Sequence, residues 1–409
     1  MGIAHKTPDS GNTRIIATEQ VWMEGEAVRQ LEQVACDPDC VAAVGMPDLH
    51  PGPGVPIGAA FGFASTVRPQ LVGSDAGCGA LVVALGKGKL SSTLARRARA
   101  EFDGPVLQDV DTDALCRAVW RRGARALTEF DLPDSLVALA ERLDGGSVAE
   151  SGEPPDAAFG DALGTIGGGN HFAEVGRVSQ INDLAMADAL GVRKGGLVVL
   201  CHSGSRGLGK AVSDKWGHAV LSDAPGGQLD AYLADLAGAV RFAQANRVVL
   251  AWRMLKALGM ARPGKVTHAF DVVHNFVRRE DFSGSPLWVH RKGCAPAADG
   301  EPAVVLGSRG APSYIMRGRG NPDGLCSVAH GAGRKMQRSE ARDKLRHRYR
   351  RAELAKSKCG SVVLCDDTKL LYEEHPDAYK PIVPVIDSLT RSQLADSVAA
   401  IDPVLTVKR

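Results

Sequence analysis

Residues 196–207 read GLVVLCHSGSRG, and this stretch joins a strand pattern directly to residues that can carry chemistry. Residues 196–201 form a continuous apolar run, which predicts a buried strand with Cys201 as a core thiol. The histidine, serines and glycines that follow predict a loop. The chain has 47 glycines, many in short runs, and glycine lets the backbone approach a ligand closely. We therefore expect a site assembled from several glycine-rich loops.

Other segments alternate between strand and helix periodicity without a regular βαβ order. Strands are predicted for residues 41–44, which run into a loop at Met46, and for residues 80–85, 287–290 and 303–307. Helices are predicted for residues 26–36, from a cap at Asp111 or Thr112 to Glu129, and for residues 228–258 and 337–356. This mixture favours one large α+β domain over residues 1–409, with layered β-sheets and surrounding helices.

The composition is that of an ordinary globular protein. Hydrophobic residues make up 44% of the 409 residues, and no apolar run reaches the roughly 18 residues that suggest a membrane span. Residues 1–14 are polar and show no secretory leader pattern. The nine cysteines include no CxxC pair, which argues against a disulfide framework and against a zinc ribbon. We therefore expect a cytoplasmic protein with no membrane partner.

Six short segments combine glycine or asparagine with possible ligands or nucleophiles. They are residues 75–79 (DAGCG), 167–171 (GGGNH), 201–207 (CHSGSRG), 273–275 (VHN), 290–293 (HRKG) and 329–334 (AHGAGR). One histidine beside a glycine is more often structural than a ligand, and His218, His268, His347 and His375 lack even this setting. Together, however, aspartate, cysteine and histidine form a mixed oxygen, sulfur and nitrogen set that suits a transition metal.

These segments, in this order, resemble the motifs of RtcB RNA ligases. The resemblance begins with Met46-Pro47-Asp48-Leu49-His50 and the GVPIG of residues 54–58, and it continues through the six segments to the TVK of residues 406–408. Arg309 and Pro312 depart from the commoner form of the nucleotide loop. The resemblance implies an RtcB-like fold and a ligase that depends on GTP and manganese.

Two manganese ions are implied by this resemblance. Asp75, Cys78 and His171 would hold one ion, while Cys78, His202 and His274 would hold the other, with the Cys78 thiolate as the bridge. Metal contact favours the thiolate over the thiol, and two cations about 3.5–4 Å apart can act on both sides of a phosphoryl displacement.

The nucleophile implied by the resemblance is His330, which would attack the α-phosphate of GTP and carry GMP. His290 is the other histidine of the six segments without a proposed metal, but it lacks this resemblance. The residues implied to contact the nucleotide are Asn170, Glu174, Ser308, Ser313, Tyr379 (stacking on guanine) and Lys408 (contacting the base). Asp48 would support the site or the metal shell.

The implied substrates are RNA ends with a 2′,3′-cyclic phosphate or 3′-phosphate and ends with a 5′-hydroxyl, and an archease-like activator is a further possible partner. Residues 334–358 carry eleven lysines or arginines against three acids, which fits either RNA contact or a solvated helix face. Two other functions remain open. The same ions could activate water in a phosphoesterase that needs no covalent histidine, or the chain could be an RNA-binding relative without turnover.

Overall fold

The structure is a computed structural model that describes residues 11–143, 152–155, 157–223, 226–262 and 264–409. The larger of its two main sheets has eight strands in the order β13-β14-β17-β6-β7-β5-β9, with β16 beside β17. Their bounds are β5 (Gly79–Lys87), β6 (Phe172–Ile181), β7 (Gly196–Ser203), β9 (His268–Val273), β13 (Pro302–Val305), β14 (Ser313–Gly318), β16 (Val362–Leu364) and β17 (Ala395–Val407).

The second main sheet has five strands in the order β1-β2-β3-β11-β10. Their bounds are β1 (Thr13–Ile15), β2 (Cys40–His50), β3 (Ile57–Phe63), β10 (Asn275–Phe282) and β11 (Ser285–Lys292). Two short pairs complete the described strands, namely β4 (Thr66–Val67) with β8 (Leu221–Ser222) and β12 (Cys294–Pro296) with β15 (Ser327–Ala329).

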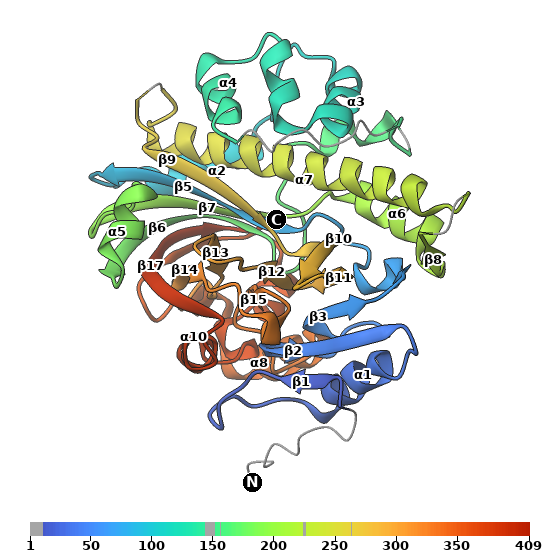
Figure 1. Cartoon of the computed structure of the whole chain (residues 1–409). Helices are drawn as coiled ribbons and strands as arrows, with labels where there is room; N and C mark the ends of the chain where they lie inside the picture. Colours follow the sequence, from blue (N-terminus) through green and yellow to red (C-terminus); the bar gives the residue numbers. More distant parts are fainter. Residues whose placement is uncertain (1–10, 144–151, 156, 224–225, 263) are drawn as a thin grey trace.

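Ten helices among the described residues pack against these sheets or against one another. They are α1 (Gly25–Ala35), α2 (Leu94–Asp103), α3 (Thr112–Arg122), α4 (Asp134–Glu141), α5 (Leu184–Ala189), α6 (Gly207–Trp216), α7 (Leu229–Leu258), α8 (Arg338–Arg348), α9 (Thr368–Glu373) and α10 (Ile382–Arg391). Figure 1 shows α7 running across one face of the larger sheet, with α3 and α4 beyond it. The five-stranded sheet lies on the other side, and α1 packs against β2. None of the described helices is both long enough and apolar enough to cross a membrane.

The α+β class expected from the sequence is confirmed, as are most of its elements. The apolar runs at 80–85, 196–201 and 287–290 lie within β5, β7 and β11, and residues 228–258 form α7. Cys201 is fully buried in β7, as a core thiol should be. Residues 1–10, part of the segment in which we expect no leader, lie outside the described residues.

Three predicted boundaries are wrong, each because tertiary contacts or one dihedral override a local pattern. The strand predicted to end before Met46 continues to His50 as β2. The helix predicted to reach Glu129 ends at Arg122, because Gly123 adopts φ 71°, and a 3₁₀ helix follows. The helix predicted to reach residue 356 ends at Arg348, where Tyr349 becomes extended and its hydroxyl donates to Asp377.

A buried polar pair on α7 fixes the strand ends of the larger sheet. Most of α7 is apolar because it lies between the sheet and other helices. Arg247 is fully buried within it and donates to both carboxylate oxygens of Asp271 in β9, at 2.6 and 2.7 Å. Its remaining nitrogen donates to the carbonyls of Gly77, just before β5, and Ser203, at the end of β7. Asn246 donates to the Ser203 hydroxyl and accepts from the Gly164 N–H.

Replacing Arg247 with methionine should therefore destabilise the protein strongly. The change leaves Asp271 as a buried charge without its cation, a loss that typically costs about 3–5 kcal/mol. Urea unfolding followed by circular dichroism measures the effect. The matched control is Lys210→Ala, which removes an exposed 2.6 Å pair with Asp214 and should change the free energy of unfolding by less than about 1 kcal/mol. Similar effects of the two substitutions would contradict the role assigned to Arg247.

Candidate functional site

The strand order brings four possible metal ligands to one end of the larger sheet. Cys78 immediately precedes β5 and His171 precedes β6, whereas His202 lies near the end of β7 and His274 follows β9. Strand β7 is antiparallel to β5 and β6, and β5 is antiparallel to β9. The starts of β5 and β6 therefore meet the ends of β7 and β9, so that segments far apart in sequence share one edge.

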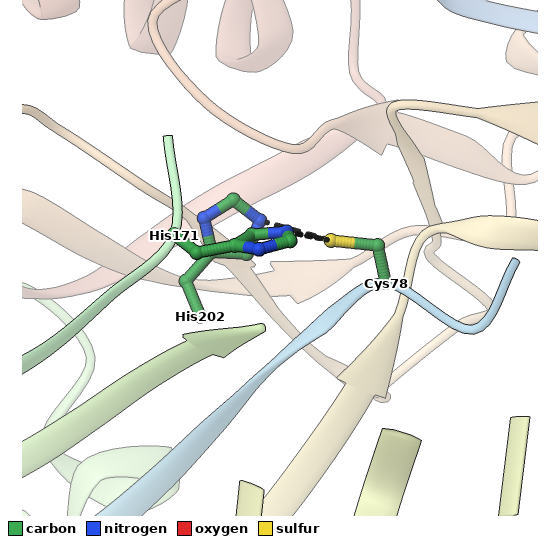
Figure 2. A group of neighbouring side chains, drawn as sticks. All are labelled: Cys78, His171 and His202. Atoms are coloured by element: carbon green, nitrogen blue, oxygen red, sulfur yellow. Dashed lines mark hydrogen bonds between the residues drawn. The ribbon is translucent and has the colours of Figure 1, made fainter. Parts of the chain in front are cut away.

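The ligand atoms of Cys78, His171 and His202 point toward one another (Figure 2). The Cys78 Sγ lies 3.3 Å from the Nε2 atoms of both His171 and His202. The His202 Nε2 lies 3.3 Å from the His274 Nε2, and Asp75 Oδ2 lies 3.0 Å from the His171 Nε2. Within the described residues, the donor atoms of Cys78, His171 and His202 all lie within 4.8 Å of one another.

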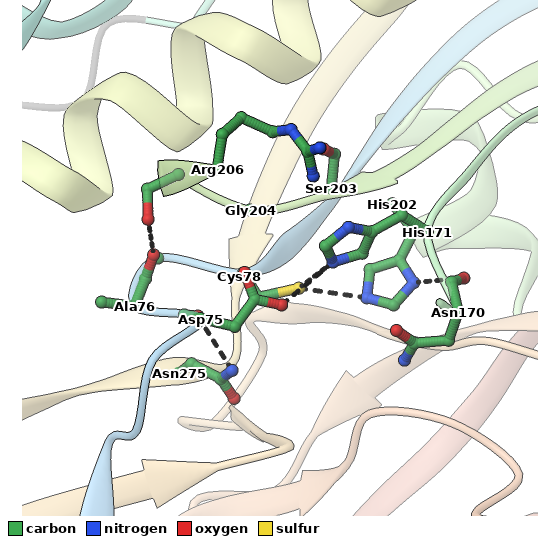
Figure 3. A network of polar contacts seen from close by, with 12 residues as sticks. Asp75, Ala76, Cys78, Asn170, His171, His202, Ser203, Gly204, Arg206 and Asn275 are labelled. Atoms are coloured by element: carbon green, nitrogen blue, oxygen red, sulfur yellow. Dashed lines mark hydrogen bonds and ion pairs between the residues drawn. The ribbon is translucent and has the colours of Figure 1, made fainter. Parts of the chain in front are cut away.

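Hydrogen bonds hold the turn that carries Asp75 and Cys78 in place (Figure 3). The Asn275 side-chain amide donates to the Asp75 carbonyl at 3.0 Å. The Ser205 hydroxyl donates to the Ala76 carbonyl at 2.6 Å. The turn is therefore fixed by Asn275, which directly follows His274, and by Ser205, which lies in the loop after His202 and β7.

The charge state of this donor set suits a metal cation. Burial, reinforced by the Asp75 carboxylate, raises the pKa of the Cys78 thiol well above its ordinary value. Burial lowers the pKa of His202 and that of His274 well below the ordinary value, which favours neutral imidazoles with free lone pairs. Lone pairs that face one another at 3.3 Å are stable only with protons or a cation between them. The residues present therefore fit a transition-metal ion.

His330 lies beside this cluster and is held by an aspartate. Its ring centroid is 4.7 Å from that of His274. Its Nδ1 lies 2.7 Å from Asp48 Oδ2 and 2.7 Å from the Gly293 carbonyl. Both partners are acceptors when Asp48 is ionised, so Nδ1 carries the proton and Nε2 keeps a lone pair. Asp48 itself is fully buried.

His290, the other histidine without a metal in the sequence-based hypothesis, has a structural role. It is fully buried, and its Nε2 accepts the Arg68 backbone N–H at 2.9 Å. Its Nδ1 lies 3.1 Å from the Trp288 carbonyl, and its ring packs edge-on against Phe63. Neither nitrogen is free to attack a phosphate.

A cavity of about 1460 Å³ contains the donor cluster and His330. Four of the six residues predicted to contact nucleotide line it, namely Asn170, Ser308, Tyr379 and Lys408. The other two lie behind the wall. Glu174 is buried and accepts the Thr406 hydroxyl at 2.5 Å, and burial raises its pKa to about 8. Ser313 accepts the Gly307 N–H at 3.0 Å and so shapes the loop that carries Ser308.

One wall of the cavity is rich in cations. The Arg334 guanidinium lies 5.1 Å from the Tyr379 ring centroid and donates to buried Glu374 at 3.0 Å. Tyr379 also donates its hydroxyl to Glu374. The Lys408 ammonium donates to the His171 carbonyl at 2.8 Å, and burial lowers its pKa to about 8. This wall can receive an anionic ligand with an aromatic ring.

Sequence reasoning missed the residues that hold the site from behind. Asn246 and Arg247 are two adjacent polar residues within an otherwise apolar stretch of the predicted helix. This contrast is the feature of the sequence that could have indicated their role. Glu374 gave no such signal, because a Glu-Glu pair in sequence is typical of an exposed surface.

Comparisons with known proteins match nearly the whole chain to one family. The model of the family "tRNA-splicing ligase RtcB" matches residues 30–409. RNA-splicing ligase RtcB2 of Escherichia coli is 36% identical over 402 residues, which cover 96% of this chain and 94% of that protein. RNA-splicing ligase RtcB of Mycobacterium tuberculosis is 33% identical over 441 residues, which cover 93% of this chain and 100% of that protein. tRNA-splicing ligase RtcB of Archaeoglobus fulgidus is 30% identical over 446 residues, which cover 94% of this chain and 92% of that protein.

The family match covers nearly the whole chain and includes every motif on which the sequence resemblance rests. The relatives align over almost their full lengths. The chain belongs to the RtcB family of RNA-splicing ligases.

Proposed function

We propose that the protein is a GTP-dependent RNA ligase that joins 2′,3′-cyclic phosphate or 3′-phosphate ends to 5′-hydroxyl ends, in RNA repair or tRNA splicing. The observation that carries this proposal is the pairing of His330 with buried Asp48 beside the donor cluster in one cavity. A phosphoesterase that activates water would not require a histidine whose Nδ1 is held so that Nε2 stays free. The names of the relatives support RNA as the substrate.

Five residues would hold two manganese ions. Asp75, Cys78 and His171 form one set and Cys78, His202 and His274 form the other, with Cys78 common to both. The contacts of 3.0–3.3 Å between their donor atoms support this grouping. When bound, such a pair of ions supplies positive charge to the phosphates and orients them for displacement.

His330 supplies the nucleophile in the first step. Its Nε2 attacks the α-phosphorus of GTP, an N–P bond forms, the bond to the β-phosphate oxygen breaks, and pyrophosphate leaves. Asp48 and the Gly293 carbonyl retain the Nδ1 proton and stabilise the positive charge that develops on the ring.

The RNA then reacts at this phosphorus. An oxygen of the RNA 3′-phosphate attacks it, the N–P bond breaks, and His330 is released. A 2′,3′-cyclic end must first be opened by water to the 3′-phosphate. The 5′-hydroxyl of the other RNA finally attacks the 3′-phosphate, loses its proton, and displaces GMP.

The nucleotide would lie along the cationic wall of the cavity. Tyr379 would stack on guanine and Lys408 would contact the base, while Ser308 would contact the phosphates or guanine and Asn170 would contact another part of GTP. All four line the cavity. Glu174 and Ser313 would act through Thr406 and Gly307, their hydrogen-bond partners.

Substitution Cys78→Ala tests the shared ligand. Because Cys78 would contribute to both ions, its loss should remove more manganese than the loss of any single histidine. Metal analysis after gel filtration measures the content, with His274→Ala as the matched variant that touches one proposed ion. Full manganese occupancy in Cys78→Ala would exclude a bridging thiolate.

Substitution His330→Ala tests the covalent step. It should abolish both labelling by α-³²P GTP and RNA joining, yet retain bound manganese, because His330 is not a proposed ligand. The label on the wild-type protein should be lost in acid and kept in base, as expected for an N–P bond. Assays with and without an archease-like protein show whether labelling needs an activator. Wild-type labelling of His330→Ala would assign the nucleophile elsewhere.

Substitutions in the basic segment around the end of α8 test whether RNA binds there. Arg338 and Arg342 line the cavity, whereas Arg346 and Arg348 in the last turn of α8, and Arg350 just after it, are exposed. Replacing the last three with glutamine should weaken RNA binding and reduce the slope of log affinity against log salt by about 2, with GMP labelling retained.

The matched control for this triple variant is Arg193→Gln with Lys194→Gln. These exposed cations lie before β7, at the end of the sheet away from His202. The control should leave the salt slope unchanged. An equal slope in both variants and the wild type would show that α8 only faces solvent.

A further inference from the structure

The strand that carries Asp48 is interrupted where it meets the nucleophile. Strand β2 pairs with β3 up to Gly45 and pairs again only at His50, opposite Ile57. Residues 46–49 have no partner in this ladder. The carbonyls on either side of Asp48, those of Pro47 and Leu49, therefore need donors from outside the sheet.

Lys380 supplies these donors. Its ammonium donates to the Pro47 carbonyl at 3.0 Å and to the Leu49 carbonyl at 2.7 Å. The side chain is buried, and although burial lowers the pKa of Lys380 to about 8, Asp48 and Glu24 favour its charged form.

The backbone of Lys380 also binds the loop of the nucleophile. Its N–H donates to the Gly333 carbonyl at 2.9 Å, three residues after His330. Gly333 has φ 73°, and a Cβ there would lie 2.3 Å from the Asp48 carbonyl oxygen, so the two backbones are in direct contact. Lys380 thus joins the segment that carries Asp48 to the loop that carries His330. It directly follows Tyr379 in the sequence.

We infer that Lys380 is a positioning residue for GMP transfer, which sets the direction of the Asp48 carboxylate and, through it, the ring of His330. This inference rests on the proposed function, because it assigns His330 as the nucleophile. The direction of the Asp48 carboxylate matters, because Oδ2 reaches His330 while Oδ1 has no hydrogen-bond partner among the described residues. A shift of the unpaired 46–49 segment would move Oδ2 away from Nδ1.

The test compares Lys380→Met, which keeps the length of the side chain but removes its donors, with Lys380→Arg. Lys194→Met, an exposed lysine at the far end of the larger sheet, is the control. The single-turnover rate of GMP transfer should fall about 100-fold in Lys380→Met, the effect expected when a reacting group is misplaced by about 1 Å. The dissociation constant for GTP and the manganese content should stay within about threefold of wild type, and Lys380→Arg should restore part of the rate.

A double-mutant cycle decides whether Lys380 acts through Asp48. Asp48→Asn should slow transfer, and adding Lys380→Met to it should have little further effect, because the two changes disrupt the same alignment. If the rate losses of the two single variants multiply in the double variant, the inference is overturned. A parallel fall in GTP and manganese binding in Lys380→Met would also overturn it and leave Lys380 as a general stabiliser.

A measurement without nucleotide separates this inference from the proposed function. The ¹⁵N resonances of His330, assigned by their absence in His330→Gln, should report an Nδ1–H tautomer in the wild type and a mixture in Lys380→Met. Unchanged resonances would overturn the role of Lys380 even if labelling occurs. The tautomer could differ between wild type and Lys380→Met while the wild type takes up no GMP. That result would contradict the ligase function and would still support the positioning of His330 by Lys380.

Discussion

The buried guanidinium of Arg247 is the interaction on which the arrangement of the site depends. It joins the ends of β5, β7 and β9 through two carbonyls and one carboxylate, and each of these ends carries or adjoins a proposed ligand. A register shift of one residue in any of these strands would turn its side chains to the opposite face. A buried charge with several fixed acceptors penalises such a shift, because the shift would leave the charge without partners.

The proposed nucleophile, His330, is carried by a different sheet from the donor cluster. Strand β15, which leads into His330, pairs with β12, which follows Gly293, so the Gly293 carbonyl lies beside the His330 ring. Asp48 lies in β2 of the five-stranded sheet. The donor cluster and His330 thus belong to different layers, and residues of both layers line the cavity. This separation explains how His330 stays outside the donor cluster while its ring centroid is only 4.7 Å from that of His274.

Arg309, one departure in the proposed nucleotide loop, is accommodated locally. Arg309 is buried and donates to the Leu371 carbonyl at 2.8 Å, which ties this loop to α9. Glu374, at the end of the same helical segment, binds Arg334 and Tyr379. A single short helix therefore supports both the loop of Ser308 and the aromatic ring proposed to stack on the base.

The sequence by itself determined the local features of this protein. Apolar runs predicted β5, β7 and α7, the motif order indicated the family, and the glycine-rich segments indicated which loops carry chemistry. These features depend on neighbouring residues, whose periodicity records which side chains are buried. Only the tertiary structure decided that β2 extends past Met46 to present Asp48, that Glu174 lies behind the cavity wall, and that His290 is saturated by Arg68 and Trp288. Contacts between residues more than 90 positions apart, such as Cys78 with His171, depend on strand order and register. Those are set by packing across the whole molecule, which no local pattern records.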